Sequence, residues 1–188
     1  MSKKGRRQKL KKGHSWKAKP GYKIFVADRG AARFDYPQRW IMKFDSDSIK
    51  FYDKQPPADD CTLAFSYRRF PPVDWKQLPV ADLLRGVVAG DERPVFHMDE
   101  PISVLRDALT LAWMEFRFMD PRERREARSR ISLAFAPDHA FGGCLQGLLT
   151  LDYWPEDAAR LGPIWDEVLH SLELGAYIDD PTQGKIMN

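Results

Sequence analysis

Residues 29–44, RGAARFDYPQRWIMKF, contain the stretch that decides the fold. Within it, residues 33–36 alternate polar and apolar side chains, which predicts a strand. Pro37 follows this strand directly, and Trp40 comes three residues later. Pro37 suits the first position of a helical turn, because the N–H that proline lacks would have no partner there. A residue of fixed φ between two large aromatic side chains favours a packing corner over a ligand site.

Alternating stretches on both sides of this corner predict further strands. YKIFVAD (22–28) precedes it, and SIKFYDK (48–54) and CTLAFSYRRF (61–70) follow it. The middle of the chain continues through residues 102–118, 128–136 and 144–154. Strands this close in sequence pair antiparallel, because a parallel pair would need a crossover of about a dozen residues or more.

Two stretches have helical spacing instead. VADLLRGVVAG (80–90) is apolar at every third or fourth position, and Gly90 is a suitable end. PEDAARLGPIWDEVLHSLEL (155–174) carries an amphipathic stripe, which Gly162-Pro163 is expected to interrupt, so that the main helix starts at Pro163. The predicted class is α+β: a single antiparallel sheet with helices packed on one face. The expected bounds are a disordered basic tail over 1–20, one domain over 21–180 and a C-terminal tail over 181–188.

The order of these elements resembles the α+β fold shared by the photosystem extrinsic protein PsbP, the Ran-binding import factor of the Mog family and bacterial DcrB-like proteins. The resemblance covers about residues 30–175 and rests on RFDYPQRW, SIKFYDK, CTLAFSY, LLTLDYW and IWDEVLHSLEL. It implies a binding function, since members are mostly adaptors, assembly factors or chaperones. It places no metal-binding or partner-contact residue on a numbered position. The basic tail and the lack of a visible thylakoid transit segment do not support a photosystem role.

Charge is divided unequally along the chain. Residues 1–23 carry ten Lys or Arg side chains and no Asp or Glu, whereas the remaining 165 residues carry 20 basic and 27 acidic side chains, a net of −7. The overall charge of +3 therefore comes from the tail. One leucine and one tryptophan among polar residues cannot bury enough apolar surface to offset the entropy of ordering, so the tail is expected to be disordered.

A tail of this composition is typical of segments that bind phosphate backbones, with a tryptophan that can stack on bases. RNA, ribosomal RNA included, is the favoured partner; an anionic membrane, an acidic protein or no specific role remain alternatives. The predicted polyanion-binding residues are Lys3, Lys4, Arg6, Arg7, Lys9, Lys11, Lys12, Trp16, Lys17 and Lys19.

A second basic cluster lies in RERREARSR, and either an anion patch or a solvated, salt-bridged turn fits it. Its arginines are Arg122, Arg124, Arg125, Arg128 and Arg130.

No motif for catalysis or for a cofactor stands out. GxSxG, P-loop and GxGxxG patterns are absent, and the four histidines do not fall at metal-ligand spacing, so no cofactor and no metal are expected. The favoured function is a non-enzymatic binding module with an unidentified protein partner and a polyanion-binding tail. One alternative is a small enzyme with a pocket at the sheet–helix seam, using His97, Asp99 or His139. Another is a chaperone-like holder of apolar segments, with an exposed groove built from Phe116, Phe118 and Trp154.

The two cysteines, Cys61 and Cys144, lie 83 residues apart without a CxxC neighbour. They are expected to be buried free thiols in a reducing compartment, with a single disulfide as the alternative. No apolar run approaches the roughly 20 residues that span a bilayer, and no secretory signal opens the sequence. The expected location is the cytoplasm, or the nucleus in a eukaryotic source.

Overall fold

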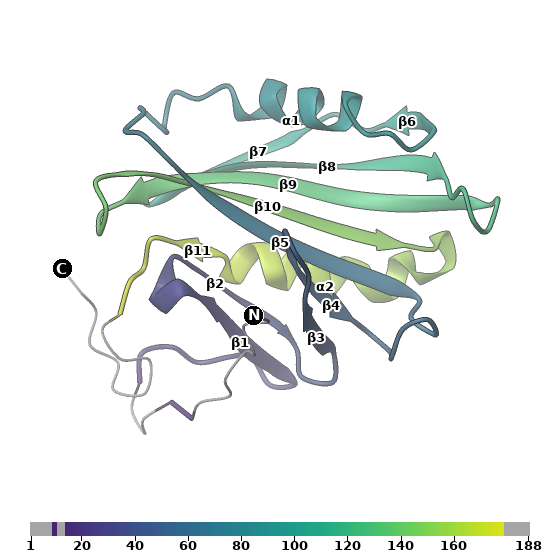
Figure 1. Cartoon of the computed structure of the whole chain (residues 1–188), viewed down its shortest axis with the longest axis horizontal. Helices are drawn as coiled ribbons and strands as arrows, with labels where there is room; N and C mark the ends of the chain where they lie inside the picture. Colours follow the sequence, from purple (N-terminus) through teal and green to yellow (C-terminus); the bar gives the residue numbers. More distant parts are fainter. Residues whose placement is uncertain (1–8, 11–13, 179–188) are drawn as a thin grey trace.

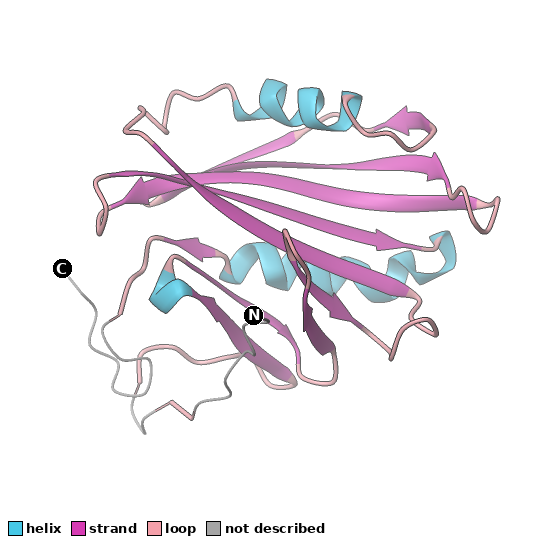
Figure 2. Ribbon diagram, in the orientation of Figure 1, coloured by secondary structure: helices cyan, strands magenta, loops and turns pink. Residues whose placement is uncertain are grey.

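A computed structural model describes residues 9–10 and 14–178 (Figure 1). Most of this part is β-structure, with two α-helices (Figure 2). Eight strands form a large antiparallel sheet in the order β3-β4-β5-β10-β9-β8-β6, and β7 also pairs with β8. Their bounds are β3 (Ile41–Phe44), β4 (Ile49–Tyr52), β5 (Cys61–Phe70), β6 (Val95–Met98), β7 (Ile102–Arg106), β8 (Leu109–Met119), β9 (Glu126–Asp138) and β10 (Gly143–Tyr153).

A second, three-stranded sheet makes the prediction of a single sheet wrong. Its order is β1-β2-β11, and its strands are β1 (Tyr22–Ala27), β2 (Ala32–Pro37) and β11 (Glu173–Leu174). A short 3-10 turn, η1 (Asp28–Gly30), joins β1 to β2. Antiparallel pairing, by contrast, is confirmed throughout both sheets.

The corner at residues 37–40 is where the chain leaves one sheet for the other. Pro37 is the last residue of β2 and not the first residue of a helical turn, which corrects the prediction made for it. The Trp40 N–H donates to the Pro37 carbonyl at 3.0 Å, and this turn directs the chain into β3. Tyr36 and Trp40 are buried, so their aromatic rings serve the core.

The helices cover opposite faces of the large sheet, whereas the sequence predicted one face for both. On β8, Leu111 belongs to the core beneath α2 (Ala158–Ser171), while Ala112 and Met114 belong to the core beneath α1 (Val80–Ala89). Because successive residues of a strand point to opposite faces, this alternation places the two helices on the two sides. Because β8 carries apolar side chains on both faces, another element must pack over each face to keep water away from them. The small sheet shares the α2 side, since Phe34 of β2 lies in that core.

The last helix is continuous through Pro163, and its expected start at that residue is wrong. A short 3-10 turn, η2 (Pro155–Asp157), leads into α2, which runs from Ala158 to Ser171 with Pro163 inside. A side chain before a proline would clash with the proline ring in helical conformation, but Gly162 has no Cβ. The helix therefore loses one backbone hydrogen bond without breaking. Among the described residues, no helix is long and apolar enough to cross a membrane.

Both cysteines are buried and free, as the sequence predicted. Burial, assisted by the charge of Asp53, raises the pKa of Cys61 to about 12, and burial also raises the pKa of Cys144. We therefore expect both thiols to react slowly with a thiol reagent in the native protein, because little thiolate is present and access is blocked. Labelling should become fast once guanidinium unfolds the chain. Native labelling of Cys61 as fast as that of a small free thiol would contradict its assigned place on β5.

Candidate functional site

Residues 14–20, called the docking segment here, lie against the folded body, although the sequence placed them in a disordered tail. His14 and Trp16 are both buried. The Arg33 guanidinium of β2 lies 4.7 Å from the centre of the Trp16 ring. The backbone N–H of Trp16 donates to His14 Nδ1 at 2.9 Å. Trp16 is thus packed in the body and does not present a free face for base stacking, which corrects its predicted role.

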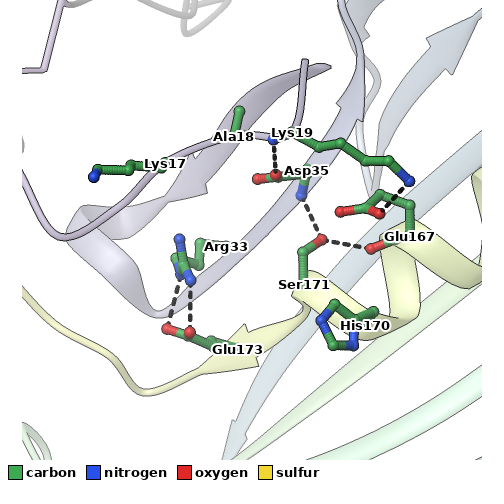
Figure 3. A pocket seen from close by; sticks show the side chains of 9 residues that line it. All are labelled: Lys17, Ala18, Lys19, Arg33, Asp35, Glu167, His170, Ser171 and Glu173. Atoms are coloured by element: carbon green, nitrogen blue, oxygen red, sulfur yellow. Dashed lines mark hydrogen bonds and ion pairs between the residues drawn. The ribbon is translucent and has the colours of Figure 1, made fainter. Parts of the chain in front are cut away.

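A charged pocket of about 450 Å³ opens between the docking segment, β2 and the end of α2 (Figure 3). Lys17, Ala18 and Lys19 of the docking segment form one wall; the others come from Arg33 and Asp35 of β2, from Glu167, His170 and Ser171 of α2, and from Glu173 of β11. Two ion pairs cross it. Arg33 binds Glu173 through two hydrogen bonds of 2.6 and 2.7 Å, and Lys19 Nζ lies 3.0 Å from a Glu167 carboxylate oxygen.

Asp35 is the buried carboxylate of this pocket, with 4% of its surface exposed. Its Oδ2 accepts the Lys19 backbone N–H at 3.3 Å, and its own N–H donates to Ser171 Oγ at 2.8 Å. The Ser171 hydroxyl in turn donates to the Glu167 carbonyl at 2.7 Å. Burial raises the pKa of Asp35, although the Lys19 N–H and the Arg33 charge act in the opposite direction.

Arg106, the last residue of β7, pairs with Leu109 of β8 and fixes the end of α2 at the pocket. Its guanidinium donates to the carbonyls of Leu169 (2.9 Å), His170 (3.2 Å) and Leu172 (3.5 Å). The last carbonyls of a helix have no partner within the helix and carry partial negative charge, so a guanidinium there satisfies and stabilises them. The positions of His170 and Ser171 therefore depend on the large sheet as well as on α2.

A second hollow, called the corner hollow here, has a volume of about 710 Å³ and lies outside the corner at 37–40. Its basic residues are Lys23, Arg39, Lys54 and Arg160. Lys54 pairs with Asp60, and Arg160 pairs with Asp53 and Asp157. Lys23 Nζ donates to the Gln38 carbonyl at 2.7 Å. Within the described part of the chain, Lys23 and Arg39 form no ion pair, so the hollow keeps an excess of positive charge.

The predicted polyanion-binding residues are only partly within the described structure. Lys9 is exposed, and Lys17 and Lys19 line the charged pocket. The others of the set, apart from Trp16, lie outside the described residues: Lys3, Lys4, Arg6, Arg7, Lys11 and Lys12.

Three of the five arginines predicted as an anion patch are held by carboxylates. Arg128 and Arg130 approach Glu115 at 3.4 and 3.0 Å. Arg125 pairs with Glu156 at 2.8 Å, and its guanidinium lies 3.5 Å from the centre of the Trp154 ring. Arg122 and Arg124, at the β8–β9 turn, form no ion pair with any described residue. Through Arg125 this turn contacts Trp154 and η2, just before α2 begins, whereas the charged pocket lies at the end of α2, a helix about 20 Å long.

The structure does not gather the residues proposed for a small enzyme, or those proposed for a chaperone-like groove, around a common pocket. His97 Nε2 lies 3.0 Å from Asp99 Oδ1 on the surface, and His139 is exposed in the β9–β10 turn; neither group lines the two hollows. Phe116 and Phe118 are buried under α1, so the exposed aromatic groove predicted from them is wrong. No cluster of three or more His, Cys, Asp or Glu suited to a metal occurs among the residues described.

Comparison with known proteins identifies the family. The model of the Alr1449 family matches residues 23–178. This chain belongs to the Alr1449 family. The protein alr1449 of Nostoc sp. is 44% identical to it over 176 residues, a match that covers 93% of this chain and 88% of the Nostoc protein.

Solved structures resemble the fold at low sequence identity. LpqN of Mycobacterium tuberculosis, described as involved in cell envelope biogenesis, has a TM-score of 0.59 at 11% identity, covering 81% of this chain and 90% of its own. CyanoP, the cyanobacterial PsbP of Synechocystis sp., has a TM-score of 0.55 at 15% identity, with 82% and 92% covered. The Ran-binding protein Mog1p of Saccharomyces cerevisiae aligns at a TM-score of 0.42, with 10% identity and 82% and 95% covered. The first two confirm the PsbP-like fold for this member of the Alr1449 family.

Proposed function

We propose that this protein is a non-enzymatic binding module that attaches to RNA through its basic N-terminal residues. The division of charge carries the proposal. Seven Lys or Arg side chains precede residue 13, with no carboxylate among them, while the chain from residue 24 onward has a net charge of −7. A phosphate backbone is attracted to the first part and repelled by the second. Binding of this kind depends on charge and not on base sequence.

The docking segment supports this proposal by fixing where the basic residues begin. Trp16 is packed against Arg33, and Lys19 is held by Asp35 and Glu167. Residues 14–20, which follow the seven cations in the sequence, are therefore held at a definite place on the body. The corner hollow is lined by Gly21 and Lys23, which follow the docking segment in the sequence, and by Arg39, so it adds two cations that form no ion pair with a described residue. A bound RNA strand could thus pass from the N-terminal residues onto the body.

The body itself has the role of holding a protein partner in this proposal. The resemblance to PsbP-like and Mog-like adaptors supports that role, and the chemistry of the partner is left open. The proposal assumes that the protein acts in the cytoplasm, or in the nucleus of a eukaryotic cell.

The test is a salt titration of binding to a single-stranded RNA of mixed sequence. Seven phosphate contacts give an expected slope of about −5 for log K against log[salt], from the coefficient for single strands. A full-length variant with the seven residues Lys3, Lys4, Arg6, Arg7, Lys9, Lys11 and Lys12 changed to Gln should bind at least about tenfold more weakly, with a slope close to zero. This variant keeps the docking segment, so the folded body is unchanged.

The matched control is Arg122→Gln combined with Arg124→Gln, which removes two exposed arginines that no described carboxylate pairs. We expect this variant to bind RNA like the parent protein. Equal affinity of the seven-residue variant and the parent would overturn the proposal. Binding to phosphatidylserine vesicles without binding to RNA would also overturn it, in favour of a membrane surface.

A further inference from the structure

We propose that the charged pocket binds a small zwitterion, a molecule with an ammonium group and a carboxylate such as a free α-amino acid. Asp35 carries this inference. Its side chain is almost fully buried, and only one of its oxygens, Oδ2, has a hydrogen-bond donor among the described residues, the Lys19 N–H at 3.3 Å. Buried carboxylates normally accept several hydrogen bonds, because removal from water is costly otherwise. The other oxygen, Oδ1, has no donor among the described residues and is not one of the fully buried atoms, so a donor inside the pocket can reach it.

The remaining charges of the pocket decide what kind of donor fits. Arg33 is committed to Glu173 and Lys19 to Glu167, so these two pairs cancel. Lys17 lines the pocket and forms no ion pair with any described residue, and its ammonium group lies at the end of the side chain farther from Asp35 (Figure 3). One uncommitted carboxylate and one uncommitted ammonium remain. A ligand with both charges can pair with each of them, whereas a simple cation would be repelled by Lys17 and a simple anion by Asp35.

The size and shape of the pocket fit a molecule of this class. About 450 Å³ lies within the usual range of small-ligand pockets, roughly 300–1,000 Å³. Hydrogen bonds hold the polar residues of the pocket in place. Ser171 Oγ accepts the Asp35 N–H and donates to the Glu167 carbonyl, and Arg106 fixes the end of α2. Asp35 is therefore held in one position before a ligand arrives, which lowers the cost of binding.

The experiment is a thermal-shift screen of the full-length protein with each standard amino acid, followed by calorimetry of those that bind. At least one amino acid at about 10 mM should raise the unfolding midpoint, with a Kd at or below about 1 mM. Methylammonium chloride and sodium acetate, each carrying only one of the two charges, should give no shift at the same concentration. Asp35→Asn should weaken binding by at least about tenfold, because a neutral amide pairs poorly with an ammonium group.

Two further variants separate ligand contact from stability. Lys17→Gln changes an exposed side chain and should weaken the binding of the amino acid without changing the midpoint of the free protein. Asp45→Asn removes an exposed carboxylate that pairs with Lys50 and should leave binding unchanged. The inference is overturned if no amino acid shifts the midpoint, if methylammonium alone binds as well, or if Asp35→Asn binds like the parent. RNA binding by Asp35→Asn is expected to stay normal, so these results are independent of the proposed RNA function.

Discussion

Replacing Trp165 by Ala is expected to lower the free energy of unfolding by about 3–5 kcal/mol, the usual cost of removing a large aromatic side chain from a core. Trp165 is fully buried at the middle of α2, between Leu161 and Val168 on the same helix face. Its ring centre lies 6.1 Å from that of Trp113 on β8, across the seam between helix and large sheet. The helix cannot move inward to fill the cavity, because Arg106 holds its end. Urea denaturation at equilibrium measures the difference.

Two controls belong to this experiment. Asp166→Ala changes the exposed neighbour and should stay within about 0.5 kcal/mol of the parent. Trp165→Phe keeps an aromatic ring and should cost less than the Ala variant, since the indole N–H has no hydrogen-bond partner among the described residues and none is lost. Parent-like stability of Trp165→Ala would mean that the buried face of α2 is assigned wrongly.

Replacing Gly30 by Ala should cost about 2–4 kcal/mol, the second-largest effect expected. Gly30 has φ +107°, a conformation that residues with a side chain rarely adopt. A Cβ there would also lie 2.9 Å from the carbonyl carbon of Ala176 and closer still to its oxygen. The segment after β11 would have to move away, although the Ile178 N–H bonds the Arg29 carbonyl and the Gly175 N–H bonds the Ala31 carbonyl. Thermal or urea denaturation measures the cost.

Gly86→Ala is the matched control for this substitution. Gly86 lies inside α1, and an added Cβ there would meet no atom within 4 Å. Alanine loses less conformational entropy than glycine in a helix, so this variant should be more stable than the parent by about 0.5–1 kcal/mol. If Gly30→Ala were as stable as Gly86→Ala, the packing of residues 175–178 over η1 would be contradicted.

Most of the strands and the packing corner could be predicted because their signals are local, although the short strands β3, β6 and β11 were missed. The alternation of apolar and polar residues along β5 and β10 indicates which side chains face the core. The large aromatic residues beside Pro37, Tyr36 and Trp40, are buried as predicted. The division into two sheets could not be predicted in this way. β2 finds its second neighbour in β11, near the other end of the chain, and alternation within a strand does not identify a partner so distant.

The second covered face was missed for a different reason. On β9, Ser129 and Ser132 are buried on opposite faces of the strand, and small polar residues at such positions resemble solvent-facing ones in the sequence. Burial of a serine depends on what packs over it, which sequence spacing alone does not show. The helix α1 is amphipathic, but its sequence does not say which side of the sheet it covers.

The charged pocket also could not be predicted from the sequence. Asp35 and Ser171 are 136 residues apart and meet only through the fold. Asp35 gave no signal either, because a carboxylate between Phe34 and Tyr36 in an alternating strand is the pattern expected of a solvent-facing residue, whereas the structure buries it. Trp16 was misassigned because composition describes a segment as a whole, whereas one aromatic ring packed on Arg33 is enough to anchor its neighbours.

The pairing of β2 with β11 has a consequence for synthesis on the ribosome. Arg33 is translated 140 residues before Glu173, the residue that completes its ladder and its ion pair. Until the last helix has emerged, the β1–β2 hairpin therefore exposes one unpaired edge together with Phe34, a combination that favours wrong pairing or recruits chaperones. The basic residues before residue 13 are translated ahead of the hairpin, so the nascent chain carries its most positive segment throughout the time in which β2 lacks its second neighbour.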